Sequence, residues 1–380
     1  MDLSLGRNPL EGLLSLRGFN YSCNQMTRST FLNPLGERRS TAIALAGLFV
    51  LSATVVSAQP KNQVVATIPV GTGPGPIVVN PTSKLVYVVN EASNAVSVIE
   101  ATTNTVAVVI PVGVGPGAVA INPAGKIVYV ENSNNGNVSL SVIYTPINAV
   151  VKTIDAGSGY PIGGLQLAVS PDGSKLYVAT GLLGEAVPVI DTATNEVSKT
   201  IKLDPPRGWG GETSGGVVFN SSGRSAYVTF FATRENSSGE TRLFISQIDA
   251  ATGKQTSVSG AIGTPSLGWT SIHGHTLYIS NETGILVFDT KTKKVVKTVP
   301  IPGYPRTNAV TPDGKYLYVP YYPNLVATID TATYKMVGSP IQVGQGALGV
   351  AIAPDGLRAY VTNATDGTVS VIDISPISPN

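Results

Sequence analysis

Short apolar runs separated by turn residues dominate the chain from Val64 onward. The runs are rich in Val, Ile and Tyr, and Gly, Pro, Asn and Asp lie between them, which is typical of β-strands joined by turns. No helical period of apolar residues appears in this region. The pattern predicts an all-β structure in which both faces of each sheet are covered, because the strands are nearly continuously apolar.

One unit recurs seven times, and a Tyr followed by a β-branched residue anchors each copy. Each unit holds four runs: an innermost strand, the Tyr strand, a strand that ends in Asp, and a last strand such as Val295–Val299. Four strands every 40–50 residues are typical of a propeller blade. We therefore expect residues 59–380 to form a single seven-bladed β-propeller of four-stranded antiparallel blades. The anchors, spaced 42, 48, 50, 51, 40 and 42 residues apart, are Tyr87, Tyr129, Tyr177, Tyr227, Tyr278, Tyr318 and Tyr360.

The two ends of the repeat region predict how the ring closes. The last unit stops after its third strand, at Ile374, and Val64–Val70 looks like a fourth strand without a blade. We expect Val64–Val70 to pair with Val369–Ile374, because an N-terminal strand that completes the last blade hides both sheet edges. A pair of β-sandwich domains, the alternative, explains neither the regular spacing nor the extra strand.

The seventh unit carries the motif of a known family. Tyr360-Val361-Thr362-Asn363 follows Pro354-Asp355-Gly356 and precedes Val371-Ile372-Asp373, and this arrangement resembles the YVTN-repeat β-propeller family. The resemblance covers Val64–Ile374. The fourth unit departs from it by insertions, and the fifth has Ser271–His275 in place of the turn motif. The resemblance implies an exported or surface propeller, and it implies architecture and location more than chemistry.

Residues 1–58 differ from the rest of the chain. Arg38 and Arg39 precede an uncharged run that ends in Val56-Ser57-Ala58, as in an export signal cleaved after Ala58. Met26 is an alternative start that leaves a leader of ordinary length. An uncleaved membrane anchor is the competing interpretation, because the run is about membrane length. We expect a mature chain without a membrane span, located in the periplasm, outside the cell or at the cell surface.

The leader also changes the charge balance. The whole chain has 25 basic and 23 acidic residues, and five of these Arg and three of these acids lie before residue 59. The mature chain is therefore neutral and lacks the basic surface of a nucleic-acid binder. The single cysteine, Cys23, precedes the apolar part of the leader, so the mature chain has no disulfide.

The turns fall into two classes, which an up-and-down blade places on opposite faces of the disc. Turns between the first and second strands, and between the third and fourth, are short and alike. The other turns vary in sequence, and bulky residues gather in those of blades three to six. Such a cluster suits a protein, peptide or carbohydrate ligand, although bulky loops could also simply pack on one another. The candidate binding residues are Tyr160, Arg207, Trp209, Glu212, Phe230, Phe231, Trp269, Glu282, Tyr304, Arg306, Tyr321 and Tyr322.

Catalytic and cofactor motifs are nearly absent. The two histidines, His273 and His275, have no evident third partner for a metal, and Gly344–Gly349 matches a dinucleotide pattern but precedes a strand. We expect a non-catalytic binding or scaffold module without cofactor or metal. The alternative is a propeller hydrolase of the lactonase type, which requires several oxygens to converge over the central channel. The oxygens available for such a site belong to Asn90, Glu91, Glu131, Asn132, Asn281, Glu282 and Asn363.

Acidic residues that recur at the same position in several blades have a structural explanation. Turn acids such as Asp172, Asp313 and Asp355 suit the turns themselves. Acids at the ends of the third strands suit capping of the turns that follow. These third-strand acids are Asp191, Asp249, Asp289, Asp330 and Asp373.

Overall fold

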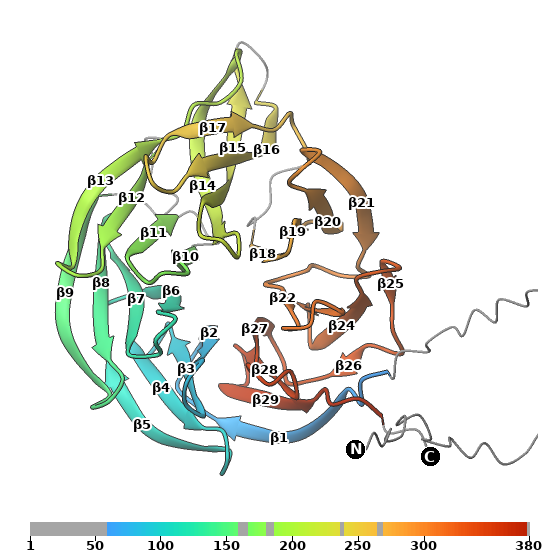
Figure 1. Cartoon of the computed structure of the whole chain (residues 1–380). Helices are drawn as coiled ribbons and strands as arrows, with labels where there is room; N and C mark the ends of the chain where they lie inside the picture. The colour runs from blue at the N-terminus through green and yellow to red at the C-terminus, as the bar shows by residue number, and fades with distance from the viewer. Residues whose placement is uncertain (1–58, 159–165, 180–185, 236–238, 264–268, 378–380) are drawn as a thin grey trace, which may run out of the picture. The chain divides into compact units, whose positions relative to one another are not determined.

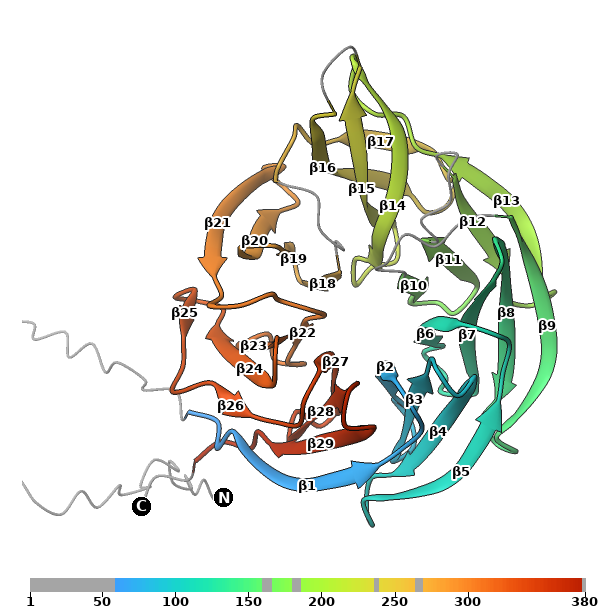
Figure 2. The same ribbon diagram turned by 180° about the vertical axis from the view of Figure 1, so that it is seen from behind.

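Seven sheets follow one another around a ring in the computed structural model of this chain (Figures 1 and 2). The structure describes residues 59–158, 166–179, 186–235, 239–263 and 269–377. All of them belong to one compact unit, Ser57–Asn380. Each sheet is antiparallel and runs outward from an innermost strand. The chain thus forms a seven-bladed β-propeller, and the predicted fold is confirmed.

The strands follow the predicted order in every blade. Blades one to three hold β2 (Pro74–Val79), β3 (Leu85–Asn90), β4 (Ala95–Glu100) and β5 (Thr105–Pro111); β6 (Pro116–Ile121), β7 (Ile127–Asn134), β8 (Asn137–Tyr144) and β9 (Ala149–Ser158); and β10 (Gln166–Val169), β11 (Lys175–Ala179), β12 (Ala186–Asp191) and β13 (Glu196–Lys202). Blades four and five hold β14 (Trp209–Phe219), β15 (Ser225–Arg234), β16 (Thr241–Asp249) and β17 (Gln255–Val258); and β18 (Thr270–His273), β19 (Thr276–Asn281), β20 (Gly284–Asp289) and β21 (Lys294–Pro300). Blade six holds β22 (Ala309–Val310), β23 (Tyr316–Tyr321), β24 (Leu325–Asp330), and an outer strand split into β25 (Lys335–Met336) and β26 (Ile341–Gln342).

Blade seven is built from both ends of the propeller. It contains β27 (Ala347–Ile352), β28 (Arg358–Asn363), β29 (Thr368–Asp373) and, as its outer strand, β1 (Gln63–Pro69). Val64 pairs with Ile372 and Pro69 with Thr368, and β1 lies along the outside of β29 (Figure 1). The ring therefore closes by the predicted pairing of an N-terminal strand with the last blade.

The repeated tyrosines pack between neighbouring blades. Tyr87 and Tyr129 are buried, and each hydroxyl reaches the turn between the third and fourth strands of the next blade. Tyr87 donates to Asn148 at 2.9 Å, and Tyr129 donates to Asn195 at 3.5 Å. Burial raises the pKa of both phenols to about 12. One tyrosine side chain thus fills the space between two blades and also bonds to the second of them.

A β-bulge interrupts the outer strand of six blades at the same place. In blade one, Val98 pairs with Val108 and Ile99 with Val106, so Ala107 has no partner. In blade six, the split between β25 and β26 interrupts the outer strand instead. Bulges twist an exposed edge away from a flat surface and hinder pairing with another chain.

None of the described residues form a helix that is long and apolar enough to cross a membrane.

Candidate binding face

The predicted division of the turns into two faces follows from the strand register. In blade one, Pro74 at the start of β2 pairs with Asn90 at the end of β3. The connection that enters a blade and the turn that follows its second strand therefore share one end of the blade, which we call the variable-loop face. The other turns lie at the opposite end, the short-turn face.

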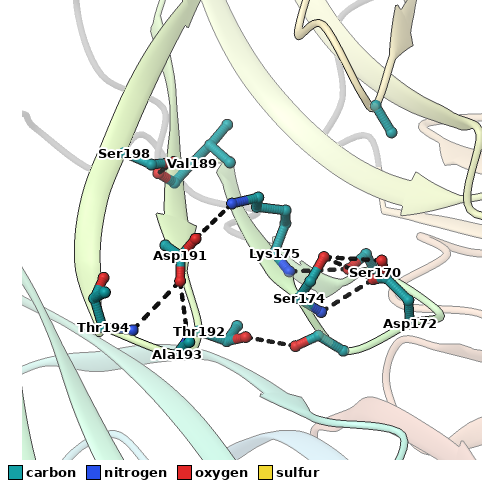
Figure 3. A network of polar contacts seen from close by, with 12 residues as sticks. Ser170, Asp172, Ser174, Lys175, Val189, Asp191, Thr192, Ala193, Thr194 and Ser198 are labelled. Atoms are coloured by element: carbon teal, nitrogen blue, oxygen red, sulfur yellow. Dashed lines mark hydrogen bonds and ion pairs between the residues drawn. The ribbon is translucent and has the colours of Figure 1, made fainter.

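Acids of the short-turn face bond to their own turns. In blade three, the Ser170 hydroxyl donates to Asp172, and Lys175 forms a 2.6 Å ion pair with Asp191 (Figure 3). These contacts, together with backbone N–H donors, lower the pKa of both carboxyls. The structural role predicted for these acids is confirmed, since backbone N–H groups of the following turn also donate to the third-strand acids Asp249, Asp289, Asp330 and Asp373.

Two exposed tyrosines lie side by side on the variable-loop face of blade six. Tyr304 belongs to the connection between β21 and β22, and Tyr322 directly follows β23. Pro305 forms an antiparallel bridge with Tyr321, and the Tyr322 N–H donates to the Tyr304 carbonyl at 3.2 Å. Tyr304 and Tyr322 are therefore opposite each other and on the same side of this short ladder. They are 66% and 58% exposed.

Arg306 extends the same ladder, and its N–H donates to the Pro320 carbonyl at 2.9 Å. Residues two apart on an extended segment share a side, so Arg306 lies on the side of Tyr304. Arg306 is half-buried, and no ion pair joins it to a carboxylate of the described residues. We call Tyr304, Arg306 and Tyr322 the tyrosine platform.

The buried ring of Tyr321 packs against the connection that carries the tyrosine platform. Tyr321 is 2% exposed and belongs to the core between blades five and six. A Cβ at position 303 would lie 2.6 Å from a ring carbon of Tyr321, so Gly303 permits the connection to approach this ring. Tyr321, a predicted binding residue, therefore serves as the buried support of the platform.

Glu282 and Trp269 lie on the same face in blade five. Glu282 is exposed, in the turn between β19 and β20, and the neighbouring Thr283 carbonyl accepts a 3.3 Å hydrogen bond from the Ile301 N–H. This bond ties the turn to the connection that carries Tyr304. Trp269 is half-buried, and its carbonyl accepts a hydrogen bond from the Asn308 side chain at 3.1 Å.

Blade four differs from the prediction. Trp209 and Phe230 lie within strands, since β14 begins at Trp209 and β15 runs for 10 residues to Arg234. The far ends of these strands extend beyond the ring at the top of Figures 1 and 2. Phe230 is fully buried and stacks on Phe244 with ring centroids 5.5 Å apart. Trp209 meets the same ring edge-on at 5.1 Å. The insertions lengthen the sheet, so these aromatics pack inside the blade instead of lining a loop.

The remaining predicted residues are scattered. Arg207 is exposed just before β14, and Phe231 is half-buried beside the core that blades four and five share. Tyr160 lies outside the described residues, as does the side chain of Glu212. Of the predicted residues, the structure brings together those of the tyrosine platform, with Tyr321 beneath them and Glu282 near them.

The asparagines considered for a cation site bond within their own blades. The Asn90 side chain donates to Ser97 at 2.9 Å, and Asn363 donates to Ser370 at 2.9 Å. Asn132 donates to Ser141 at 3.1 Å. In these three blades the amide group donates to a serine of the third strand of the same sheet, which is a structural contact within the blade.

Two further candidates are Asn281, which bonds locally, and Glu91, which lies near enough to Glu131 to affect its pKa. Asn281 accepts hydrogen bonds from Thr283 and Gly284 in its own turn, and Glu91 is exposed. Among the described residues, no three His, Cys, Asp or Glu side chains are placed to hold a metal ion. His273 and His275 are both exposed.

Asn132 and Asn363 each keep a buried Oδ1 without a hydrogen-bond partner among the described residues, and Glu131 keeps two such oxygens. The Glu131 side chain is fully buried in β7. Burial is the main cause that raises the pKa of this carboxyl to about 8; the nearby Gly117 backbone N–H lowers it by a smaller amount, and the negative charge of Glu91 adds a smaller rise. At neutral pH Glu131 is therefore a neutral acid, so it cannot serve as an anionic cation ligand without losing its proton.

Polar side chains join different blades near the innermost strands. Gln166 of blade three accepts from the Val217 N–H of blade four at 3.2 Å. Its amide also donates to the Thr270 carbonyl of blade five at 2.9 Å. In blade seven, Thr362 donates to the Gly75 carbonyl of blade one at 2.8 Å. Sequence reasoning missed these ties because they join residues up to 287 positions apart.

Comparisons with known proteins agree with the observed ring. A family model described as "Lactonase, 7-bladed beta-propeller" matches residues 48–181, which is less than half of the 380-residue chain. "Antigen Lp49" of Leptospira interrogans serogroup Icterohaemorrhagiae serovar copenhageni (strain Fiocruz L1-130) is 29% identical over 217 residues, which are 52% of this chain and 44% of that protein. The match thus spans less than half the length of this relative.

A solved structure resembles the fold over a longer stretch. Kuenenia stuttgartiensis Hydrazine Synthase superimposes with a TM-score of 0.62 and 21% identity, covering 80% of this chain and 96% of that one. At this identity the likeness concerns the fold alone. The blades and the matches together identify the chain as a seven-bladed β-propeller.

Proposed function

We propose that this chain is an exported β-propeller of the YVTN-repeat kind that binds a partner through its variable-loop face. The observation that carries the proposal is the tyrosine platform. The rings of Tyr304 and Tyr322 are exposed to solvent, and backbone hydrogen bonds hold the loops that carry them. Their exposure is therefore not the result of a loosely held loop. Exposed aromatics held in place are typical of surfaces that a partner covers.

Export is supported by the leader-like pattern of residues 1–58, by the YVTN motif at Tyr360–Asn363 and by the description of the relative as an antigen. We expect the protein purified from its native host to begin at Gln59, because signal peptidases cleave after a small-x-small sequence such as Val56-Ser57-Ala58. Amino-terminal sequencing tests this. A purified protein that still begins at Met1 or Met26 contradicts cleavage and favours the anchor.

Site-specific photocrosslinking in the native host tests the binding face. A photoreactive phenylalanine analogue replaces Tyr322, and the matched control carries it at Tyr144, a 36% exposed tyrosine that ends β8 at the short-turn face. We expect a discrete adduct from position 322 that is much weaker from position 144, because only the platform is proposed to lie against a partner. Equal labelling at both positions, or none at 322, rejects the binding face.

The family match over residues 48–181 keeps a lactonase-type hydrolase as the second candidate. Glu131 lies inside the matched region and would be its acid, since burial holds it protonated at neutral pH. Lactone hydrolysis that disappears in Glu131→Gln, while Tyr322→Ala leaves it intact, would favour the hydrolase over the binding module.

A further inference from the structure

We infer that the tyrosine platform binds a neutral polysaccharide chain, an inference that rests on the binding function proposed above. The ring of a sugar presents an apolar C–H face, and its rim carries hydroxyls that both donate and accept. Tyr304 and Tyr322 offer flat apolar faces with polar tips. Arg306 offers a planar set of donors, and Glu282 offers carboxylate acceptors. The tyrosine platform and Glu282 thus supply the apolar faces, the donors and the acceptors that a polysaccharide requires.

The surroundings of the platform favour a narrow ligand over a protein. A stable protein interface covers about 800 Å² on each partner around an apolar centre. Among the described residues, this face has one other large exposed apolar side chain, Val114, on the connection between blades one and two. The rest lie on outer strands, at the short-turn face or near the C-terminus, and are Val65, Val109, Tyr144, Ile147, Val151, Val197, Val296, Leu357 and Ile377. A single chain that stacks on two rings needs no wider apolar surface.

The charges near the platform favour an uncharged ligand. Arg306 has no ion pair with a described carboxylate, so it can donate to a ligand. Glu282 is exposed in a turn that is hydrogen-bonded to the same connection, and it would repel a strongly anionic chain, while Arg306 would repel a cationic one. Hydroxyl groups are attracted to both, because they accept from the guanidinium and donate to the carboxylate.

The fixed geometry of the platform also suits a weakly interacting polymer. Hydrogen bonds of 3.2 and 2.9 Å hold the connection to β23, and the buried Tyr321 supports it. A site already in its bound arrangement loses little conformational entropy on binding. Opposite positions on an antiparallel ladder lie about 5 Å apart, so adjacent rings can support consecutive stretches of one chain.

Calorimetric titration of the protein purified from its host tests the inference. The probes are cellohexaose, chitohexaose and maltohexaose as neutral chains, an oligogalacturonate as the anionic comparator, and a polyproline peptide as the protein-like comparator. We expect at least one neutral oligosaccharide to bind. Tyr304→Ala and Tyr322→Ala should each weaken its binding by about 5- to 150-fold, because loss of a binding anchor costs about 1–3 kcal/mol. Unfolding midpoints should stay unchanged, because both side chains are largely exposed.

Two controls separate the platform from general effects of substitution. Tyr304→Phe keeps the ring and should bind within about threefold of the native protein, since stacking uses the face of the ring. Tyr144→Ala removes a tyrosine from the opposite face and should change nothing. Oligosaccharide binding that survives Tyr304→Ala and Tyr322→Ala places the sugar elsewhere and overturns the inference.

The comparators distinguish failure of this inference from failure of the proposed function. If only the polyproline peptide or the oligogalacturonate binds, and Tyr304→Ala abolishes that binding, the neutral sugar is wrong and the binding face stands. If no probe binds but position 322 still crosslinks, the sugar is again rejected and the face stands. If no probe binds and no adduct forms at position 322, both are rejected.

Discussion

A chain that begins at Gly71, and so lacks β1, is expected to lose several kcal/mol of unfolding free energy and to aggregate when concentrated. β1 supplies the outer strand of blade seven, and its removal leaves β29 with an unpaired edge. Exposed edges template pairing with other chains, and a ring with one open blade can unfold from that blade. Urea unfolding and light scattering measure the two effects. The matched control begins at Gln59, and equal midpoints for the two chains would contradict a closing role for β1.

The contacts of the closing strand explain the size of this effect. Beyond β1, Pro60 bridges to Pro376, and Lys61 forms a 3.1 Å ion pair with Asp373. Asn62 has a positive φ of 53° and accepts a 2.8 Å hydrogen bond from the Tyr318 hydroxyl. Asn148 takes the same two roles, with φ 47°, in the continuous turn of blade two. The third and fourth strands of blade seven come from opposite ends of the propeller. Asn62 nevertheless accepts the same kind of tyrosine hydrogen bond as Asn148, which lies in a continuous turn.

Point variants separate packing from strand pairing within β1. Ile68 is 2% exposed and packs in the core between blades seven and one. Ile68→Ala should therefore cost about 2–5 kcal/mol. Val65 is the unpaired bulge residue of the same strand and is 49% exposed, so Val65→Ala should cost at most about 0.5 kcal/mol. Similar losses from both would mean that any change in β1 destabilises the ring.

The sequence predicts the blades and their closure because each rests on a local pattern. The Tyr strand, the Pro-Asp-Gly turn and the capping acid stand close together in each unit, and all three bond or pack as their residue types require. Closure needed one more step, the match between Val64–Val70 and a last unit that lacks a fourth strand. The register of β1 against β29 bears out that match.

The candidate site is less predictable because it depends on strand length and on contacts between blades. Phe230 and Tyr321 look like loop residues, yet both are buried. In blade four the inserted residues prolong β15, and in blade six the connection folds back over Tyr321. By contrast, Tyr304 and Tyr322 are 18 positions apart, and only the bridge from Pro305 to Tyr321 makes them neighbours. No spacing rule in one sequence reveals such a pair.

Glu131 shows how one repeat position carries different chemistry in different blades. It stands in the anchor Tyr129–Asn132 where blade seven has Thr362, and Thr362 donates to the neighbouring blade at 2.8 Å. Thr362 is small and finds a partner, whereas the longer Glu131 is buried without one among the described residues. A buried carboxyl without partners is far more stable with its proton than without it.

Glu131 should therefore make the propeller less stable as pH rises. The pKa of its carboxyl is about 8 in the folded protein and 4.5 when unperturbed, so between these values the native state holds a proton that the unfolded chain has released. Stability falls with pH wherever the native state binds more protons. The loss begins near pH 4.5 and is complete above pH 8, where the folded protein also ionises. The aspartates whose pKa is lowered titrate below this window.

Glu131→Gln should remove most of this dependence, because the amide keeps the shape of the side chain and does not ionise. A difference of one pH unit corresponds to about 1.4 kcal/mol, so the variant should exceed the native protein in unfolding free energy by about 3 kcal/mol at pH 7. The gap should be under about 1 kcal/mol at pH 5. Urea unfolding at pH 5, 6, 7 and 8 measures it, with Glu196→Gln, an exposed position, as the matched control. Parallel pH profiles for the native protein and Glu131→Gln would show that the buried carboxyl does not hold its proton.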